Sequence, residues 1–198
     1  MRTLKPCLEN QLFILDDFGY DGRGAYYLGK NGGNEIESAC KNLINKIIEM
    51  LGAKKIVFCG TSKGAWAALN LMTSFDNSIA IVGSPQYKLG DYLMIPAHET
   101  TRKYVLSGSD FQAVDQLNVY LKNKLEFSNP QRHKIYLHYS DSEHTYQDHI
   151  KFLIEDLNQY GYPLENEVKH YTDHWDVGKH YPEFLIRCLK KESYSLKV

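Results

Sequence analysis

The stretch Gly60-Thr61-Ser62-Lys63-Gly64 holds the residues whose types and spacing most clearly suggest chemistry. An apolar run, "KKIVFCG" at 54–60, precedes Ser62, and an alanine- and leucine-rich run with helical spacing follows at 65–72. A Gly-x-Ser-x-Gly motif between a strand and a helix predicts a nucleophile elbow, a strained turn that lifts the serine hydroxyl clear at the helix N-terminus. The Lys63 N–H would then point to where an oxyanion forms. The alternative is a tight strand-to-helix connection in which the serine has no chemical role.

A serine nucleophile needs a base, and the base needs an orienting carboxylate. Two carboxylates, Asp141 and Glu143, follow the apolar run "HKIYLHYS" at 133–140. Asp141 lies nearer the end of this predicted strand, whereas Glu143 reaches further by one methylene. The spacing along the chain does not decide which of these two carboxylates orients the base.

The candidate base is His174, which follows the predicted strand "EVKHYT" at 167–172. In the α/β-hydrolase order the acid precedes the histidine, and both lie in loops after later strands. His180, at the start of the next predicted helix, is the alternative base.

Three further histidines, His138, His144 and His149, raise the question of a metal. Their spacing lacks a compact two-histidine motif, so we predict neither a metal site nor a cofactor.

The surrounding pattern alternates helices with strands that are apolar on both faces, which predicts an α/β domain with a mainly parallel sheet of five or six strands covered on both sides. One domain is expected over 1–198, with 86–130 as a cap or insertion. The predicted strands are 12–16, 54–60, 78–85, 133–140 and 167–172. The predicted helices are 34–51, 65–72, 110–125, 148–160 and a last one that contains Pro182 near its start.

Composition excludes several classes of protein. A net charge of −1 without a long basic block argues against nucleic acid or an anionic membrane as the main partner. No apolar run reaches the roughly 20 residues of a membrane span, and the N-terminus lacks the apolar core of a signal peptide. The four cysteines are scattered along the chain, which favours buried thiols of a cytoplasmic protein over a disulfide framework.

Three stretches carry a family resemblance: "ILDDFGYDGRGAYYLGKNG", "GTSKGAWAAL" and "AIVGSPQYKLGDYL". They resemble the α/β-hydrolase-like domain of bacterial capsular polysaccharide biosynthesis proteins and, more distantly, the acetyltransferase subunit of the accessory Sec system. The resemblance implies an α/β-hydrolase fold, a Ser–acid–His triad and acyl, in the first instance acetyl, ester chemistry on surface carbohydrate. Carried over, the triad falls on Ser62, His174 and Glu143, with Asp141 kept as the alternative acid. Lys63 departs from the less polar residue that many hydrolases have there.

The second oxyanion donor is harder to place, because in many hydrolases it comes from an earlier strand and loop. The glycine-rich loop 18–29 is the expected source, with Gly19 the first candidate donor, since its glycines leave backbone N–H groups accessible. The alternatives are that these glycines only serve turns, or that the sequence is a fragment of a longer chain that carries the donor.

The leading hypothesis is a serine-dependent carbohydrate O-acyl esterase or acyltransferase of bacterial surface polysaccharide biosynthesis. A small-molecule esterase or thioesterase could use the same triad. A third reading, from another class, is a non-catalytic glycan-binding or scaffolding domain. The expected partners are a carbohydrate or acyl-ester substrate and the proteins of a capsule or glycan assembly machinery.

Overall fold

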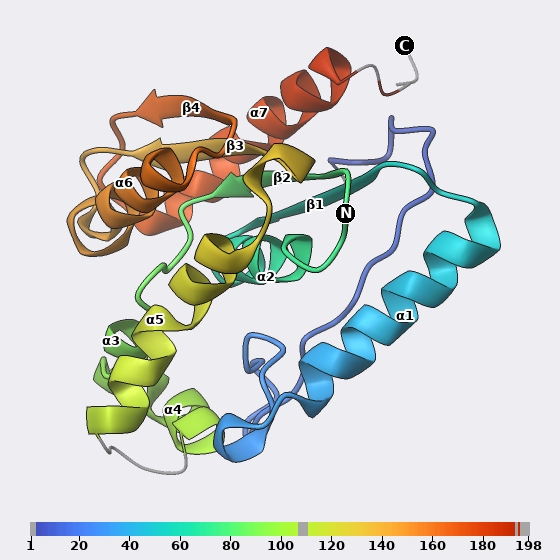
Figure 1. Cartoon of the computed structure of the whole chain (residues 1–198). Coiled ribbons are helices and arrows are strands. Elements are labelled where there is room, and N and C mark those ends of the chain that lie inside the picture. The colour runs from blue at the N-terminus through green and yellow to red at the C-terminus, as the bar shows by residue number, and fades with distance from the viewer. Residues whose placement is uncertain (1–2, 107–110, 193, 195–198) are drawn as a thin grey trace.

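The computed structural model describes residues 3–106, 111–192 and 194, and in this part of the chain four parallel strands form one sheet (Figure 1). The strands lie in chain order and are β1 (Ile56–Thr61), β2 (Ser78–Gly83), β3 (His133–Ser140) and β4 (Leu164–Lys169). Gly83 pairs with Thr61 on one side and with His138 on the other. Because all four strands run the same way, their carboxyl ends share one edge of the sheet.

Helices connect the strands, as parallel pairing requires. They are α1 (Glu35–Leu51), α2 (Lys63–Met72), α3 (Leu89–Leu93), α4 (Glu99–Leu106), α5 (Phe111–Phe127), α6 (Lys151–Tyr160) and α7 (Val177–Lys191). Single turns of 3-10 helix occur at Lys30–Gly32, Pro96–His98, Pro130–Arg132 and His174–Asp176, and a π-helical turn occurs at Tyr146–Ile150.

Apolar cores lie on both faces of the sheet, and a third, smaller cluster joins α1 to Leu71 and Phe75. On β2, Ala80 and Val82 belong to the core that α2, α5 and α6 complete, whereas Ile79 and Ile81 belong to the core under α7. Alternate residues of a strand point to opposite faces, so the buried strand must be apolar throughout. The predicted helix–sheet–helix layering is confirmed.

The predicted elements differ from the observed ones mostly at their ends. Strand β3 has the predicted bounds, while β4 begins three residues earlier than the predicted 167. The predicted first residue of the helix at 110–125, Asp110, lies outside the described residues. The 86–130 region contains α3, α4 and α5 between β2 and β3.

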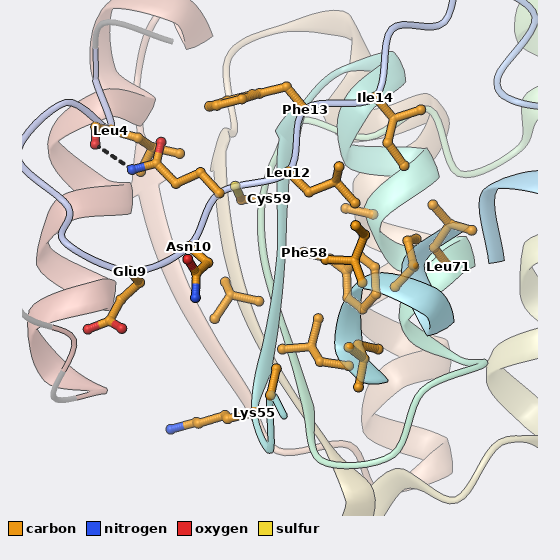
Figure 2. A pocket seen from close by; sticks show the side chains of 18 of the residues that line it. Leu4, Glu9, Asn10, Leu12, Phe13, Ile14, Lys55, Phe58, Cys59 and Leu71 are labelled. Carbon is orange, nitrogen blue, oxygen red and sulfur yellow. Dashed lines mark hydrogen bonds between the residues drawn. The ribbon is translucent and has the colours of Figure 1, made fainter. Parts of the chain in front are cut away.

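The prediction of a strand at 12–16 is wrong, and with it the count of five or six strands. This segment runs between α1 and the sheet, beside the edge of β1, without joining the ladder (Figures 1 and 2). The Tyr27 hydroxyl donates to the Ile14 carbonyl at 2.7 Å. In a strand, this carbonyl would instead accept a hydrogen bond from the neighbouring strand. A groove of about 750 Å³, lined by side chains that include Leu12, Phe58 and Leu71, occupies the space at this edge (Figure 2). The apolar run therefore serves to cover the edge of β1, not to extend the sheet.

No helix within the described residues combines the length and the apolar character that crossing a bilayer demands.

Candidate active site

Four side chains that follow the four strands meet at the carboxyl edge of the sheet. Ser62 comes directly after β1, Gln86 follows β2, Glu143 follows β3 and His174 follows β4. In open parallel sheets this edge is where ligands bind. The fold thus gathers residues that are far apart in the sequence.

The nucleophile turn has the strained backbone that the motif predicts. Ser62 has φ 52° and ψ −118°, a conformation that costs a non-glycine residue of the order of 1–3 kcal/mol. Its N–H donates to the Gly83 carbonyl at 2.8 Å, and its carbonyl accepts from the Ala65 N–H at 3.0 Å. Bonds to β2 and to the first turn of α2 therefore hold the strained residue in place.

The two glycines of the motif have different roles. A Cβ at Gly60 would lie 2.5 Å from the carbonyl carbon of Gly64, so β1 and α2 can approach this closely only without a side chain there. A Cβ at Gly64 would meet no described atom within 4 Å. Close packing therefore requires the first glycine but not the second.

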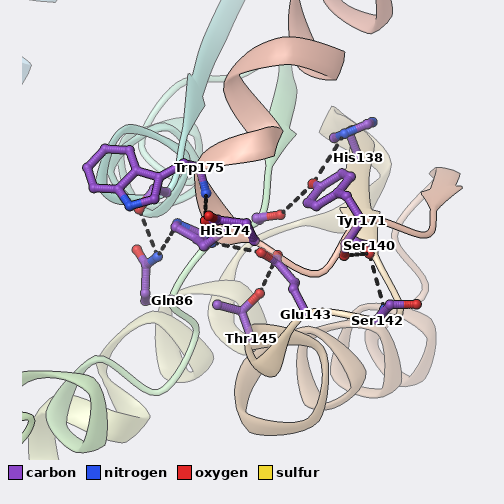
Figure 3. A network of polar contacts seen from close by, with 12 residues as sticks. Gln86, His138, Ser140, Ser142, Glu143, Thr145, Tyr171, His174 and Trp175 are labelled. Carbon is purple, nitrogen blue, oxygen red and sulfur yellow. Dashed lines mark hydrogen bonds and ion pairs between the residues drawn. The ribbon is translucent and has the colours of Figure 1, made fainter.

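Gln86 connects the serine to the histidine. Its Nε2 donates to the Ser62 hydroxyl at 2.8 Å and lies 3.4 Å from His174 Nε2 (Figure 3). The hydrogen bonds of the described residues join Ser62 to His174 through this amide and not directly. Gln86 is fully buried, and among the described residues its Oε1 has no hydrogen-bond partner.

His174 pairs with Glu143 on the side of the ring away from Gln86. The distance from His174 Nδ1 to Glu143 Oε2 is 3.0 Å, and the glutamate side chain is fully buried while the imidazole is one-fifth exposed. A carboxylate facing Nδ1 favours the tautomer with its proton there, which leaves Nε2 free to accept a proton. This is the arrangement that a general base requires.

Glu143 is kept ionised in spite of its burial. Burial by itself raises its pKa, but hydrogen bonds from His174, Thr145 and Ser84 outweigh that effect, and the pKa lies below its usual value. A carboxylate that stays charged at neutral pH could stabilise an imidazolium at His174.

The alternative acid and base lie in other contacts. Asp141 accepts from the exposed His170, whose Nδ1 is 2.8 Å away, and it also accepts from the Ser142 hydroxyl. The His180 ring stacks on Tyr171, with centroids 5.2 Å apart. The structure therefore brings Glu143, and not Asp141, to the imidazole of His174.

Lys63 and Gly19 are the predicted oxyanion donors. Lys63 is the first residue of α2, and the first N–H groups of a helix have no acceptor within it. Gly19, with φ 96°, packs against the Gly24 backbone in the loop that precedes α1. Their role as donors stays a prediction.

The histidines considered for a metal lie in separate surroundings. His138 is buried behind the site, where its Nδ1 is 3.1 Å from Glu167 and its Nε2 is 3.4 Å from the Tyr171 hydroxyl (Figure 3). His149 Nδ1 accepts from the Lys88 N–H, and burial lowers its pKa to about 4. His144 lies near His174, with ring centroids 6.1 Å apart.

Trp175, next to His174 in the same 3-10 turn, is 84% exposed. The Asp173 carboxylate accepts from its backbone N–H at 2.9 Å and so fixes the turn. An exposed tryptophan beside a candidate base is an apolar surface open to a substrate.

Sequence reasoning missed Gln86, Ser84 and Thr145. Ser84 and Gln86 follow β2 within three residues, so a search for polar side chains at the carboxyl ends of predicted strands would have found both. Thr145 offers no such signal, because its hydroxyl contributes only through contact with Glu143.

Comparison with known proteins establishes the class of fold. No protein-family model matches the chain, and no curated protein matches it in sequence. Solved structures do match, and they include an O-acetyltransferase and a serine hydrolase, so the chain has the α/β-hydrolase-like fold.

Three similar structures illustrate the range. The capsule O-acetyltransferase of Neisseria meningitidis serogroup A is 22% identical with a TM-score of 0.72, covering 86% of this chain and 69% of that one. A mutant of that enzyme in complex with CoA is 20% identical, with a TM-score of 0.69 over 85% and 70% of the chains. The Glycosylation Associate Protein (Gap123) complex of Streptococcus agalactiae is 17% identical, with a TM-score of 0.72 over 86% of this chain and 35% of that one. At these identities the likeness concerns the fold.

Proposed function

We propose that this protein is a serine-dependent carbohydrate O-acyltransferase or esterase, which forms an acyl-enzyme on Ser62 and either makes or cleaves acetyl esters of carbohydrate. His174 is the proposed base, Glu143 the acid that orients it, and the Lys63 N–H the first oxyanion donor, with Gly19 the first candidate for the second. The observation that carries the proposal is the buried Glu143 carboxylate against His174 Nδ1, linked through Gln86 to a serine on a strained turn.

In the first half-reaction the Ser62 oxygen attacks the acyl carbon of the donor, and its proton passes to His174 Nε2. The bond from the acyl carbon to the leaving oxygen or sulfur breaks, and the leaving group takes the proton from His174. Gln86 donates to the Ser62 oxygen and leaves the hydroxyl proton free, so the proposed step requires the hydroxyl and His174 Nε2 to come within hydrogen-bond distance before attack.

In the second half-reaction an acceptor hydroxyl gives its proton to His174 and attacks the acyl carbon, and the Ser62 oxygen leaves with that proton. A sugar hydroxyl as acceptor gives transfer, whereas water gives hydrolysis. The 86–130 region, which lies between β2 and β3, is proposed as the cap over this site.

Carbohydrate as the substrate class is supported from two sides. The exposed Trp175 offers an aromatic face on which a sugar ring can stack beside His174. Two of the similar structures are a capsule O-acetyltransferase and a glycosylation-associated complex. Because a mutant of the former binds CoA, acetyl-CoA is the first donor to test. A small-molecule esterase and a glycan-binding scaffold are the competing functions, and partners in a glycan assembly machinery belong to the proposal.

Labelling of Ser62 tests the proposal. A fluorophosphonate probe and acetyl-CoA should each leave an adduct on Ser62, detected by peptide mass spectrometry, and turnover of nitrophenyl acetate should fall by several orders of magnitude in Ser62→Ala. The variant should remain folded, because it loses only one hydroxyl from a strained turn. Retained turnover in folded Ser62→Ala protein would overturn the role of Ser62, and a wild-type protein that neither turns over nor labels would favour the scaffold.

A further inference from the structure

Lys63 contributes to the proposed site in a second way, through its side chain. The backbone of Lys63 opens α2 beside Ser62, while its ammonium extends to the glycine-rich loop and donates to the Arg23 carbonyl at 2.7 Å. The same ammonium lies 3.2 Å from Asp16 Oδ2. One residue thus joins the nucleophile turn to a loop about 40 positions earlier.

Asp16 holds the next residues of that loop. Its carboxylate accepts from the Ala25 N–H at 2.9 Å and from the Tyr26 N–H at 2.9 Å, and its side chain is only 3% exposed. A buried carboxylate is stable only where donors and an opposite charge satisfy it. The pair Lys63–Asp16 therefore fixes the backbone of 23–26 at three nearly consecutive points.

The loop is shaped around this pair. A Cβ at Gly24 would lie 1.9 Å from Lys63 Nζ and 2.6 Å from Asp16 Oδ2, so the ammonium occupies the space that a side chain would fill. Gly24 itself has φ 94°, and Tyr26 and Tyr27 follow with φ 59° and 57°. Such conformations persist in non-glycine residues only where surrounding contacts impose them.

We propose that Lys63 and Asp16 form a clamp that holds the loop segment 23–26 against the start of α2, and that Lys63 is thereby a positioning residue for acyl transfer. The clamp keeps the backbone N–H groups of the loop in a fixed place relative to the helix N-terminus that carries the Lys63 N–H. Oxyanion stabilisation depends on donors that need no reorganisation during the reaction, so loosening the loop should slow the chemical step more than it weakens binding. The inference rests on the proposed function.

A double-mutant cycle tests the clamp. Lys63→Met keeps the length of the side chain and removes its charge, Asp16→Asn keeps the shape of the acid, and the third variant combines both. Each is measured for kcat and KM with nitrophenyl acetate, for the rate of fluorophosphonate labelling, and for the melting temperature. We expect Lys63→Met to lower kcat roughly 10- to 100-fold, because losing one oxyanion donor costs about 10²–10³ and the Lys63 N–H remains. KM should change by less than about threefold. The double variant should be no slower than the slower single variant, since a clamp is lost once.

Two further variants separate positioning from general stability. Lys63→Arg keeps the charge and should have most of the wild-type kcat. If Lys63→Met fails to fold, this variant still tests the clamp. Lys134→Met breaks a lysine–carboxylate pair of similar exposure, 2.9 Å from Nζ to Glu192 Oε1 at the opposite, amino end of β3, and should leave kcat unchanged.

The outcomes distinguish the two proposals. Wild-type kcat in folded Lys63→Met, additive losses in the cycle, or an equal loss in Lys134→Met would overturn the clamp alone. A wild-type Ser62 that neither turns over substrate nor labels would overturn the proposed function and the clamp with it.

Discussion

Replacing Glu143 by glutamine tests the step on which proton transfer depends. The substitution keeps the size of the side chain but removes the charge that faces His174 Nδ1 at 3.0 Å. A hydrogen bond to a charged partner contributes about 1.5–3 kcal/mol, and this contribution is complete only when His174 carries the proton in the transition state. At 1.36 kcal/mol per factor of ten, the expected loss in kcat is roughly 10- to 150-fold.

The Coulomb attraction sets an upper bound on this loss. For an imidazolium and a carboxylate at about 4 Å with an effective dielectric constant of about 20, the attraction is about 4 kcal/mol, or roughly 10³ in rate. Because His174 is one-fifth exposed, water screens part of this attraction, and we expect the measured value to fall below the bound.

The assay compares kcat for nitrophenyl acetate in Glu143→Gln and in Asp141→Asn. The second variant is the matched control, because Asp141 pairs with the exposed His170 instead of His174. Its kcat should stay within about twofold of the wild type. Melting temperatures show whether both variants are folded. A Glu143→Gln protein that keeps half of the wild-type kcat, or an Asp141→Asn protein that loses as much, would refute the assignment of the acid.

Three other predictions follow from the packing, the charges and the surface. Gly60→Ala should lower the free energy of unfolding by about 1–3 kcal/mol or more, because the new Cβ would meet the Gly64 backbone. Gly64→Ala should stay within about 1 kcal/mol of the wild type. Equal losses of the two variants in urea unfolding would contradict this. Burial by itself raises the pKa of Glu37, but hydrogen bonds, first among them that from Lys124, lower this pKa to about 2. The ionised Glu37 therefore stabilises the folded state fully above the pKa of an unfolded glutamate, about 4.3, and this stabilisation is lost as the pH falls toward 2. The melting temperature of Glu37→Gln should therefore fall less than that of the wild type between pH 5 and 2, whereas parallel curves would show that Glu37 is not responsible. Trp175→Ala should raise the KM for a sugar acceptor about 2- to 10-fold, because ring stacking contributes about 0.5–1.5 kcal/mol. The KM for nitrophenyl acetate should change less. An unchanged KM for the acceptor would show that Trp175 is not part of the binding surface.

Features that depend on neighbours along the chain can be predicted from the amino-acid sequence alone. The glycine–serine motif between an apolar strand and a helix predicts the strained turn at Ser62, since the turn is built from the residues of the motif. Hydrophobic periodicity likewise predicts the four strands of the sheet and the long helices within a few residues, because each element buries a face that its own spacing defines. The run at 12–16 is the exception: it has the composition of a strand, but pairing requires a second chain segment at hydrogen-bond distance.

Which side chains meet at the site depends, in contrast, on how the elements pack in three dimensions. The choice between Asp141 and Glu143 depends on how the loop after β3 approaches His174, which lies 31 positions after Glu143. The spacing along the chain does not distinguish the two carboxylates. Gln86 reaches both Ser62 and His174 only because the register of the four parallel strands aligns their ends. Asp16 pairs with Lys63, next to Ser62, although more than 40 residues separate the two in the sequence. No local sequence pattern predicts this pair. Contacts of this kind arise from the packing of whole elements, so their geometry exists only once the sheet and its covering helices are assembled.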